Sequence, residues 1–144
     1  MHMYPSKNEN GFVLLDALVA VLIFSFGILG IVALQASATK LGADAKYRTD
    51  AALLADRLIA DMWGAVPSTI ATDYITDGSA YNTWRDNLVD CAKAKVVTNC
   101  LPGVTANPPT VVVGDNNLVT ITVKWQAPQE TTPHQYVTIS QIQQ

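Results

Sequence analysis

A continuous apolar stretch begins close to the N-terminus, at Phe12, and ends at Leu34. Its 23 residues contain one ionisable side chain, Asp16, and one other polar side chain, Ser25. At 1.5 Å per residue, a helix of this length measures roughly 34 Å, slightly more than the ~30 Å hydrocarbon core of a bilayer. Because backbone polar groups in lipid must bond within their own segment, the pattern predicts a membrane-spanning helix.

Two other structures compete for the same stretch. A buried core helix is one, but a chain of 144 residues has too little remaining length to cover so long an apolar cylinder. A cleaved secretory signal is the other, with Lys7 as its charged start and Ala36-Ser37-Ala38 as its cleavage site. Its apolar core would exceed the usual length of about 7–15 residues and would contain Asp16. The membrane helix is therefore the preferred prediction.

The hydrophobic pattern changes after this stretch but does not stop. Apolar side chains recur at alternating spacings of four and three residues, interrupted once by Arg48, which predicts an amphipathic helix. The predicted buried stripe consists of Leu34, Ala38, Leu41, Ala45, Ala52, Ala55, Ile59 and Met62. Charged residues fall mostly off this stripe: Lys40, Lys46, Asp50, Arg57 and Asp61. Gly64 and Pro67 supply a stop, so one helix is expected from Phe12 to about Trp63, with residues 35–64 as its amphipathic continuation. A membrane anchor followed by a separate core helix is the alternative.

Residues 65–144 are expected to form a small α+β head. Alternation of apolar and polar positions, together with β-branched side chains, predicts strands at Thr110–Val113, Leu118–Trp125 and Tyr136–Ile142. The turn cluster Gly114-Asp115-Asn116-Asn117 separates the first two. A short helix or turn is expected over Trp84–Ala94. The strands then form an antiparallel meander with one face on the Leu41–Met62 part of the long helix.

Composition changes this picture only by showing where charge is missing. The chain is 49% apolar and 15% charged, with a formal net charge of −3, whereas an ordinary soluble domain carries about 25% charged residues. The deficit is concentrated in the predicted membrane helix. An acidic chain without a basic stripe is not expected to bind nucleic acid, and Lys93, Lys95 and Lys124 make only a weak basic spot.

The cysteines bear on orientation. Cys91 and Cys100 are the only two, and an even number in a small exported head favours a disulfide, with two reduced thiols as the alternative. A disulfide would place the head in an oxidising compartment and the N-terminus inside. This is useful because the lysines and acids that flank the apolar stretch do not set an orientation by the positive-inside rule.

No pattern typical of catalysis or of a metal site is present. His2 lies near the N-terminus, and His134 follows Pro133, where a solvated loop residue is expected. The scattered acids Asp73, Asp77, Asp86 and Asp90 are expected at the surface, and their spacing matches no EF-hand. We therefore expect no enzymatic activity, no cofactor and no metal site.

Asp16 is the residue that needs an explanation. A carboxylate at the centre of a membrane helix costs about 2.5–3.5 kcal/mol, and an ordinary residue at the start of a helix, favoured there by the helix dipole, is one interpretation. If the chain were cut after Gly11, Phe12 would carry a new amine. Asp16 lies four residues further along, on the same helical face. Its partner would then be such an amine, either its own or that of a neighbouring subunit.

The run Gly11-Phe12-Val13-Leu14-Leu15-Asp16 resembles the class III signal of type IV pilins and related pseudopilins. In that signal a short polar leader ends in glycine and is followed by phenylalanine, three apolar residues, an acid and a long apolar helix. The resemblance implies that a prepilin peptidase removes residues 1–11 by cutting between Gly11 and Phe12, and that it N-methylates Phe12. It also implies that Asp16, where the family has glutamate, pairs with a subunit's N-terminal amine during assembly, and that the fold is pilin-like.

Further matches resemble the minor pilins of the PilV type, the pilus modification proteins. The matching segments are Asp16–Ala20, Gly27–Gln35, Trp84 with Leu88, Leu101-Pro102-Gly103 and Val119–Trp125, with an insertion at Val89–Cys100. This resemblance implies a subunit that helps prime pilus assembly together with other minor pilins and the major pilin. It would be held in inner-membrane lipid, with its head in the periplasm, and would then enter the extracellular pilus. A type II secretion pseudopilin is the first alternative, and a non-polymerising, single-pass anchored periplasmic binding protein is the second.

Overall fold

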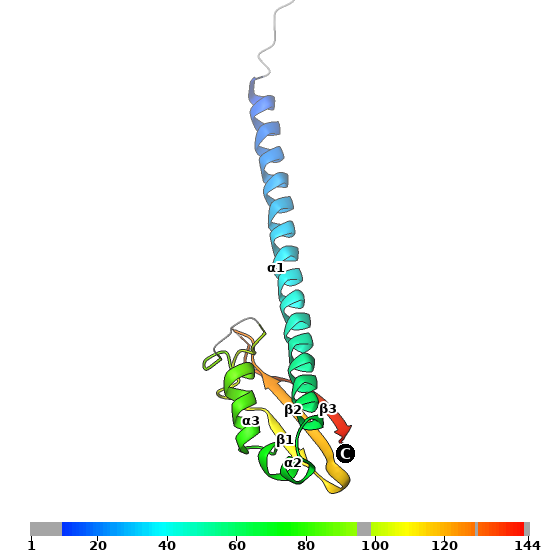
Figure 1. Ribbon diagram of the computed structural model, residues 1–144. Coiled ribbons are helices and arrows are strands. Elements are labelled where there is room, and N and C mark those ends of the chain that lie inside the picture. Colours follow the sequence, from blue (N-terminus) through cyan, green and yellow to red (C-terminus); the bar gives the residue numbers. More distant parts are fainter. Residues whose placement is uncertain (1–9, 95–98, 129, 143–144) are drawn as a thin grey trace, which may run out of the picture. The chain divides into compact units, whose positions relative to one another are not determined.

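The computed structural model describes residues 10–94, 99–128 and 130–142. Its elements, in chain order, are α1 (Asn10–Trp63), α2 (Pro67–Asp73), α3 (Ser79–Trp84), the π-helical turn η1 (Arg85–Val89), β1 (Thr110–Val113), the 3-10 turn η2 (Asp115–Asn117), β2 (Leu118–Trp125) and β3 (His134–Gln141), as Figure 1 shows. The chain is an α+β protein, as the sequence predicts. Most of the predicted leader, residues 1–9, lies outside the described residues, and Asn10 and Gly11 begin α1.

The chain divides into two compact units, Met1–Gly42 and Ala43–Gln144. In the described part of the first unit the backbone is helical throughout, and every side chain from residue 12 to residue 42 is exposed. The second unit contains the rest of α1 and all the other elements. The prediction of one helix from Phe12 to about Trp63 is confirmed, because α1 is a single element of 54 residues.

The end of α1 follows the expected signals. Gly64 and Ala65 close the last turn with backbone N–H groups that donate to the carbonyls of Asp61 and Met62, both at 3.2 Å. Pro67 does more than stop the helix, because it occupies the start of α2, where a missing N–H has no consequence.

The sheet has three antiparallel strands in the order β1-β2-β3. The first two strands have the predicted bounds, while the third begins at His134 rather than Tyr136 and ends at Gln141 rather than Ile142. In the turn between β1 and β2, Asn116 and Asn117 adopt positive φ angles of 55° and 53°. Asparagine tolerates this left-handed backbone better than most residues, so the predicted turn cluster has a conformational reason.

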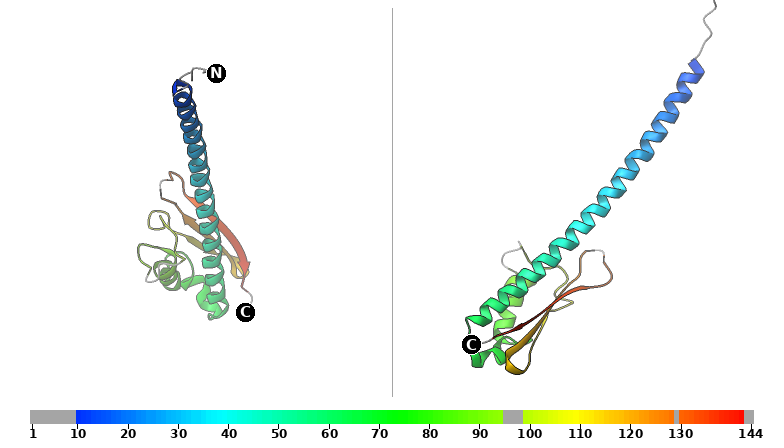
Figure 2. Two further views of the ribbon diagram at one scale, coloured as in Figure 1. Left: turned by 90° about the horizontal axis from the view of Figure 1, so that it is seen from above. Right: turned by 90° about the vertical axis from the view of Figure 1, so that its right-hand side faces the viewer.

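The core of the second unit lies between one face of the sheet and the part of α1 that belongs to this unit, as the two views of Figure 2 agree. The sheet contributes the inward positions of β2, which are buried as the alternation predicts: Val119, Ile121, Val123 and Trp125. The helix contributes Ala51, Leu54, Ala55, Leu58 and Met62. Burial of these apolar side chains, at roughly 25 cal/mol per Å², is the main force that holds helix and sheet together.

The predicted stripe on the helix is correct only in part. Leu41 is 68% exposed and Ala45 is exposed, so packing begins at the partly buried Tyr47. Leu54 and Leu58, which the predicted stripe leaves out, are 5% and 1% exposed. The apolar residues of α1 cover more than one face, so spacing alone does not fix which face meets the sheet.

A helical segment also covers this core beside α1. The short helix or turn expected over residues 84–94 begins earlier, because α3 and η1 together run from Ser79 to Val89. Trp84 is buried, and its indole N–H donates to the backbone carbonyl of Leu54 at 3.0 Å. The Tyr81 hydroxyl donates to the carbonyl of Pro109. These two bonds tie the segment to α1 and to the approach to β1.

Candidate functional site

The most extensive exposed apolar surface of the described residues lies on the N-terminal part of α1, from Phe12 to Leu34. Every side chain from Phe12 to Leu34 is exposed, and the large ones strongly so, with Phe12 at 75% and Phe24 at 68%. This is a helix long and apolar enough to cross a membrane, with a mean hydropathy of 2.8 over a window that is not buried at all. Exposed apolar area of this extent is unfavourable in water, so the surface requires lipid or other protein.

The polar groups on this surface are few. The Ser25 hydroxyl donates to the carbonyl of Val21 within the helix at 2.7 Å, so it is satisfied without a partner molecule. Asp16 is exposed. The structure places Gly11, Phe12 and Asp16 in the first two turns of α1, so Phe12 and Asp16 share one helical face, as their spacing predicts.

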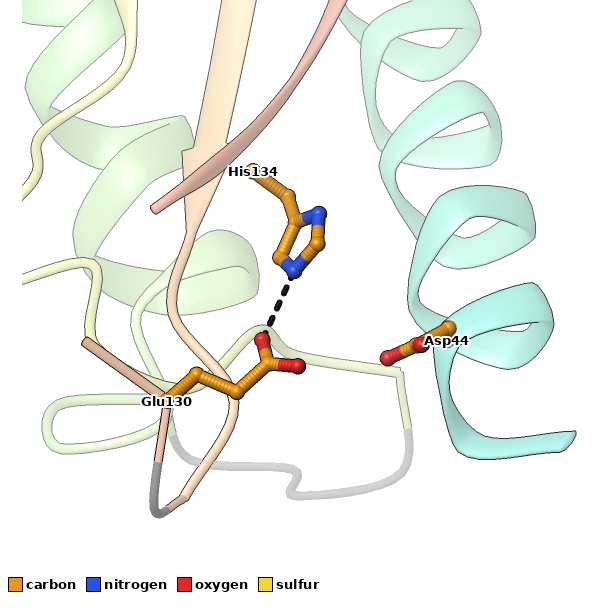
Figure 3. Close-up of side chains that lie close together, drawn as sticks. All are labelled: Asp44, Glu130 and His134. Carbon is orange, nitrogen blue, oxygen red and sulfur yellow. Dashed lines mark hydrogen bonds and ion pairs between the residues drawn. The ribbon is translucent and has the colours of Figure 1, made fainter. Parts of the chain in front are cut away.

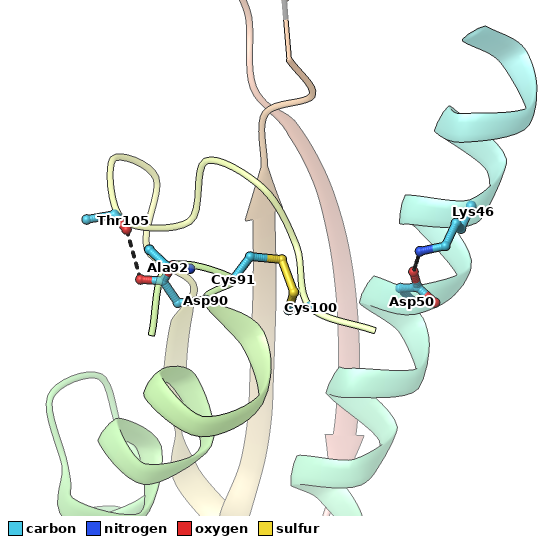
Figure 4. The surroundings of a disulfide bond; sticks show 7 residues. All are labelled: Lys46, Asp50, Asp90, Cys91, Ala92, Cys100 and Thr105. Carbon is cyan, nitrogen blue, oxygen red and sulfur yellow. Dashed lines mark hydrogen bonds and ion pairs between the residues drawn. A yellow bond between two sulfur atoms is a disulfide. The ribbon is translucent and has the colours of Figure 1, made fainter. Parts of the chain in front are cut away.

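The two cysteines form a disulfide. Their Cα atoms are 5.0 Å apart, and nine positions separate them in sequence (Figure 4). On the chain-entropy model a loop of this length contributes about 2.7 kcal/mol. The backbone N–H of Leu101 donates to the carbonyl of Val89 at 2.8 Å beside the bridge, so a covalent bond and a hydrogen bond close the same loop.

Two acids are buried, and Figure 4 shows both: Asp90, which was expected at the surface, and Asp50, which was expected off the apolar stripe of the helix. Asp90, only 3% exposed, accepts hydrogen bonds from the backbone N–H of Ala92 at 3.0 Å and from the Thr105 hydroxyl at 2.9 Å. Asp50, 8% exposed, accepts from Lys46 Nζ at 2.7 Å. The surface prediction for Asp90 was wrong, because both buried carboxylates have local donors that replace water. Asp77, by contrast, is exposed as expected.

A charged cluster lies at η1. Arg85 Nε donates to Asp86 Oδ1 at 2.6 Å, and Lys93 Nζ reaches the same oxygen at 3.1 Å. The hydrogen bond from Arg85 holds the pKa of Asp86 below its ordinary value. Arg85 also lies over the ring of Tyr81, whose pKa is raised mainly by burial. Of the predicted basic spot, Lys93 is therefore paired, and Lys95 lies outside the described residues.

A cavity of about 690 Å³ opens in the second unit between the end of α1 and α3. Its lining includes Asp61, Tyr74 and Thr83 beside the apolar Leu58 and Trp84. The Tyr74 hydroxyl donates to the backbone carbonyl of Asp61 at 3.3 Å, and burial raises its pKa.

One cluster escaped the sequence analysis. His134 is the first residue of β3, where its ring stacks on Trp125 and its Nε2 lies 2.7 Å from Glu130 Oε2. Asp44 of α1 joins them, and one ligand-type atom from each of the three lies within 4.8 Å of the others (Figure 3). The expected histidine is exposed, but it lies at the start of a strand and not in a loop. The spacing of Glu130 and His134 was visible in sequence, whereas the approach of Asp44 depends on the tertiary fold.

The chain matches no family model, no curated protein and no solved structure. The fold and the exposed helix define its class: an α+β protein with a disulfide-bonded head, whose N-terminal helix is long and apolar enough to span a membrane.

Proposed function

We propose that the chain is a minor pilin of a type IV pilus, a structural subunit that helps prime pilus assembly. It is inserted in the inner membrane with its head in the periplasm, is cut between Gly11 and Phe12 by a prepilin peptidase, and enters the fibre by helix packing. The observation that carries this proposal is the fully exposed apolar surface of residues 12–34. A surface of this kind suits two environments in turn, lipid before assembly and the helices of neighbouring subunits afterwards.

Helix packing alone supplies little preference for one neighbour over another. Lipid tails are as apolar as leucine, so moving an apolar helix from lipid into a helical bundle releases little hydrophobic free energy. Specific assembly therefore needs a polar device within the apolar surface. Asp16 is the one carboxylate available between Phe12 and Leu34.

The partner we propose for Asp16 is the N-methylated amine of Phe12 on an adjacent subunit, either a minor or the major pilin. In a medium of low dielectric constant, a carboxylate without a partner is costly, whereas one paired with an ammonium group is stabilised. A subunit in the wrong register would leave both charges unpaired, so the pair selects the register. Aspartate is one methylene shorter than the family's glutamate, so the helices must approach more closely here.

Analysis of the N-terminus tests this proposal directly. The full chain is expressed with and without a prepilin peptidase, and its N-terminal residue is determined by mass spectrometry. We expect N-methyl-Phe12 only when the peptidase is present. Gly11→Leu is expected to block the cut, because the resemblance implies a peptidase that requires glycine, which has no side chain, at this position. The matched variant Gly27→Leu lies beyond the cut and should leave processing intact.

The other outcomes separate the alternatives. An intact Met1 in the presence of the peptidase would contradict the proposal and indicate an anchored binding protein. A chain that begins at Thr39 would indicate a cleaved secretory signal. If Phe12 is methylated, co-purification with sheared pili supports a pilin, and absence from pili with retention in a type II secretion complex supports a pseudopilin.

A further inference from the structure

The structure assigns a second chemistry to the head. We propose that Asp44, Glu130 and His134 bind a divalent transition-metal ion of the Zn²⁺ type. The three side chains come from three places in the second unit: Asp44 lies on α1, Glu130 in the loop after β2, and His134 at the start of β3. Figure 3 shows the carboxylates and the imidazole gathered in one place.

The donor set fits Zn²⁺. Zinc binds imidazole nitrogen and carboxylate oxygen at about 2.0–2.2 Å and usually takes four ligands in a tetrahedral arrangement. Ligand atoms around such an ion are roughly 3.4 Å apart, which follows from those bond lengths. His134 Nε2 and Glu130 Oε2 are 2.7 Å apart, and one ligand-type atom of each of the three residues lies within 4.8 Å of the others. Small side-chain rotations therefore suffice to bring all three ligands to the ion.

The change at the histidine is a simple exchange. Without metal, a proton lies between Nε2 of His134 and the Glu130 carboxylate in their hydrogen bond. On binding, the ion takes the place of this proton and Nε2 gives its lone pair to the metal. The ring keeps one proton, on Nδ1: a neutral ring moves its Nε2 proton there by exchange with water, and a doubly protonated ring releases one proton to solvent. The second carboxylate, Asp44, balances the second charge of the ion.

Burial favours the site. The side chain of Glu130 is only 13% exposed, and that of His134 is 43% exposed, so the cluster is partly withdrawn from water yet open to an entering ion. Stacking of the imidazole on Trp125, with ring centroids 5.8 Å apart, restricts the orientation of the histidine. A ligand that is already oriented loses less entropy on binding.

A cavity of about 180 Å³ adjoins the cluster, lined by Asp44, Arg48, Trp125 and His134 among others. It leaves room for the water that completes a zinc site with three protein ligands.

Harder cations fit less well. Ca²⁺ and Mg²⁺ prefer oxygen ligands throughout, and an imidazole replaces one of them poorly. The guanidinium of Arg48, which also lines the cavity, opposes weak binding of any cation. The binding free energy must therefore include a coordinate bond to the imidazole nitrogen, which Zn²⁺ forms, because electrostatic attraction to the carboxylates alone is too weak.

The experiment uses the full chain in a non-ionic detergent, stripped of metal with a chelator that is then removed. Zn²⁺ is titrated in by calorimetry and equilibrium dialysis, and we expect one ion per chain and a higher unfolding temperature, because an ion that binds only the folded state stabilises it. Asp44→Asn, Glu130→Gln and His134→Gln should each weaken binding at least about tenfold, as lost ligands do. Ca²⁺ should not compete at equal concentration.

Two matched controls keep the test specific. Asp56→Asn removes an exposed carboxylate of α1 outside the cluster, and His2→Gln removes the other histidine; both should bind Zn²⁺ like the wild type. Circular dichroism without metal verifies that each variant is folded, and Co²⁺ in place of Zn²⁺ should give visible absorption that His134→Gln abolishes. Failure of the wild type to bind Zn²⁺, or unchanged binding in all three ligand variants, would overturn the proposal. Neither result bears on the pilin proposal, which depends on residues 11–34.

Discussion

At the scale of single residues, the proposed function depends most on the carboxylate of Asp16. We expect Asp16→Ala to insert in the membrane normally, because it removes a charge that disfavours lipid, but to enter pili roughly tenfold less, which corresponds to losing about 1.4 kcal/mol. Asp16→Glu should keep most of the incorporation because it keeps the charge. The measurement is the amount of the chain in sheared pili relative to membranes, by quantitative immunoblotting.

Ser25→Ala is the matched control for this experiment. Ser25 is the other polar side chain of the stretch, but its hydroxyl is bonded to its own helix at Val21. Its removal should therefore leave incorporation unchanged. Wild-type amounts of Asp16→Ala in sheared pili would contradict a role for the carboxylate in assembly.

The second prediction concerns how the stabilisation by Asp86 depends on pH. Its pKa is lowered in the folded chain, first by the hydrogen bond from Arg85, so its contribution to stability is present above the ordinary pKa of 3.8 and is lost as pH falls through the lower folded value. Asp86→Asn should therefore destabilise the chain at neutral pH, with a difference from wild type that shrinks below about pH 3.8. Unfolding temperatures in non-ionic detergent measure this, and Asp56→Asn, at an exposed carboxylate of α1 away from Arg85, serves as control. A difference that grows on acidification would contradict the assignment.

Residue environments were the least predictable part of the sequence. The pairing of Cys91 with Cys100 was expected from their number and context, and the disulfide is present. Asp90 was expected in solvent but is buried. His134 is exposed as expected, but its stacking on Trp125 and its hydrogen bond to Glu130 were not predicted. A polar residue is buried when tertiary neighbours supply donors or acceptors, and those neighbours are not adjacent in sequence.

At the scale of elements, two adjacent leucines in the part of α1 that belongs to the head differ strongly in burial. Leu54 is 5% exposed in the core, whereas Leu53 is 54% exposed. Leu54→Ala should lower the free energy of unfolding by about 2–5 kcal/mol, because it removes buried methyl groups and leaves a cavity. Leu53→Ala should change it by no more than about 0.5 kcal/mol. Denaturant unfolding, followed by the fluorescence of the buried Trp84 and Trp125, reports on the head. Equal effects of the two variants would contradict the packing of α1 on the sheet through the face that contains Leu54.

The elements themselves were predictable where a strong period dominates. The bounds of β1 and β2 agree with the sequence prediction, because Leu118–Trp125 alternates throughout its length. The helix was predicted as one continuous element, and α1 is one. The face that α1 buries was predicted only in part, because alanines and leucines surround the helix and the choice between them is made by the shape of the sheet. The helix α2 was missed, because Pro67 was interpreted only as a stop.

At the scale of the whole molecule, sequence and structure agree on an α+β chain with one apolar helix of membrane-spanning length. That much follows from composition and periodicity, since no other element of the chain has a comparable apolar run. The proposed metal cluster could not be found this way, because Asp44 meets Glu130 and His134 only after α1 has packed on the sheet. Long-range placement of side chains is a property of the folded head.

The orientation of the molecule is the remaining large-scale prediction. The charges near α1 do not set it, so the prediction of a periplasmic head depends on the Cys91–Cys100 disulfide, because disulfides persist in oxidising compartments and not in the bacterial cytoplasm. We expect a C-terminal alkaline phosphatase fusion to the full chain to be active, because that enzyme needs periplasmic oxidation, and a fluorescent protein that matures only in the cytoplasm to stay dark in the same place. Deleting residues 12–34 from both fusions is the control, and it should reverse both signals by removing the segment that directs the head across the membrane. An inactive phosphatase fusion and a fluorescent cytoplasmic reporter on the full chain would place the head in the cytoplasm. A disulfide does not persist there, and a head in the cytoplasm could not enter an external fibre, so this result would contradict the predicted orientation.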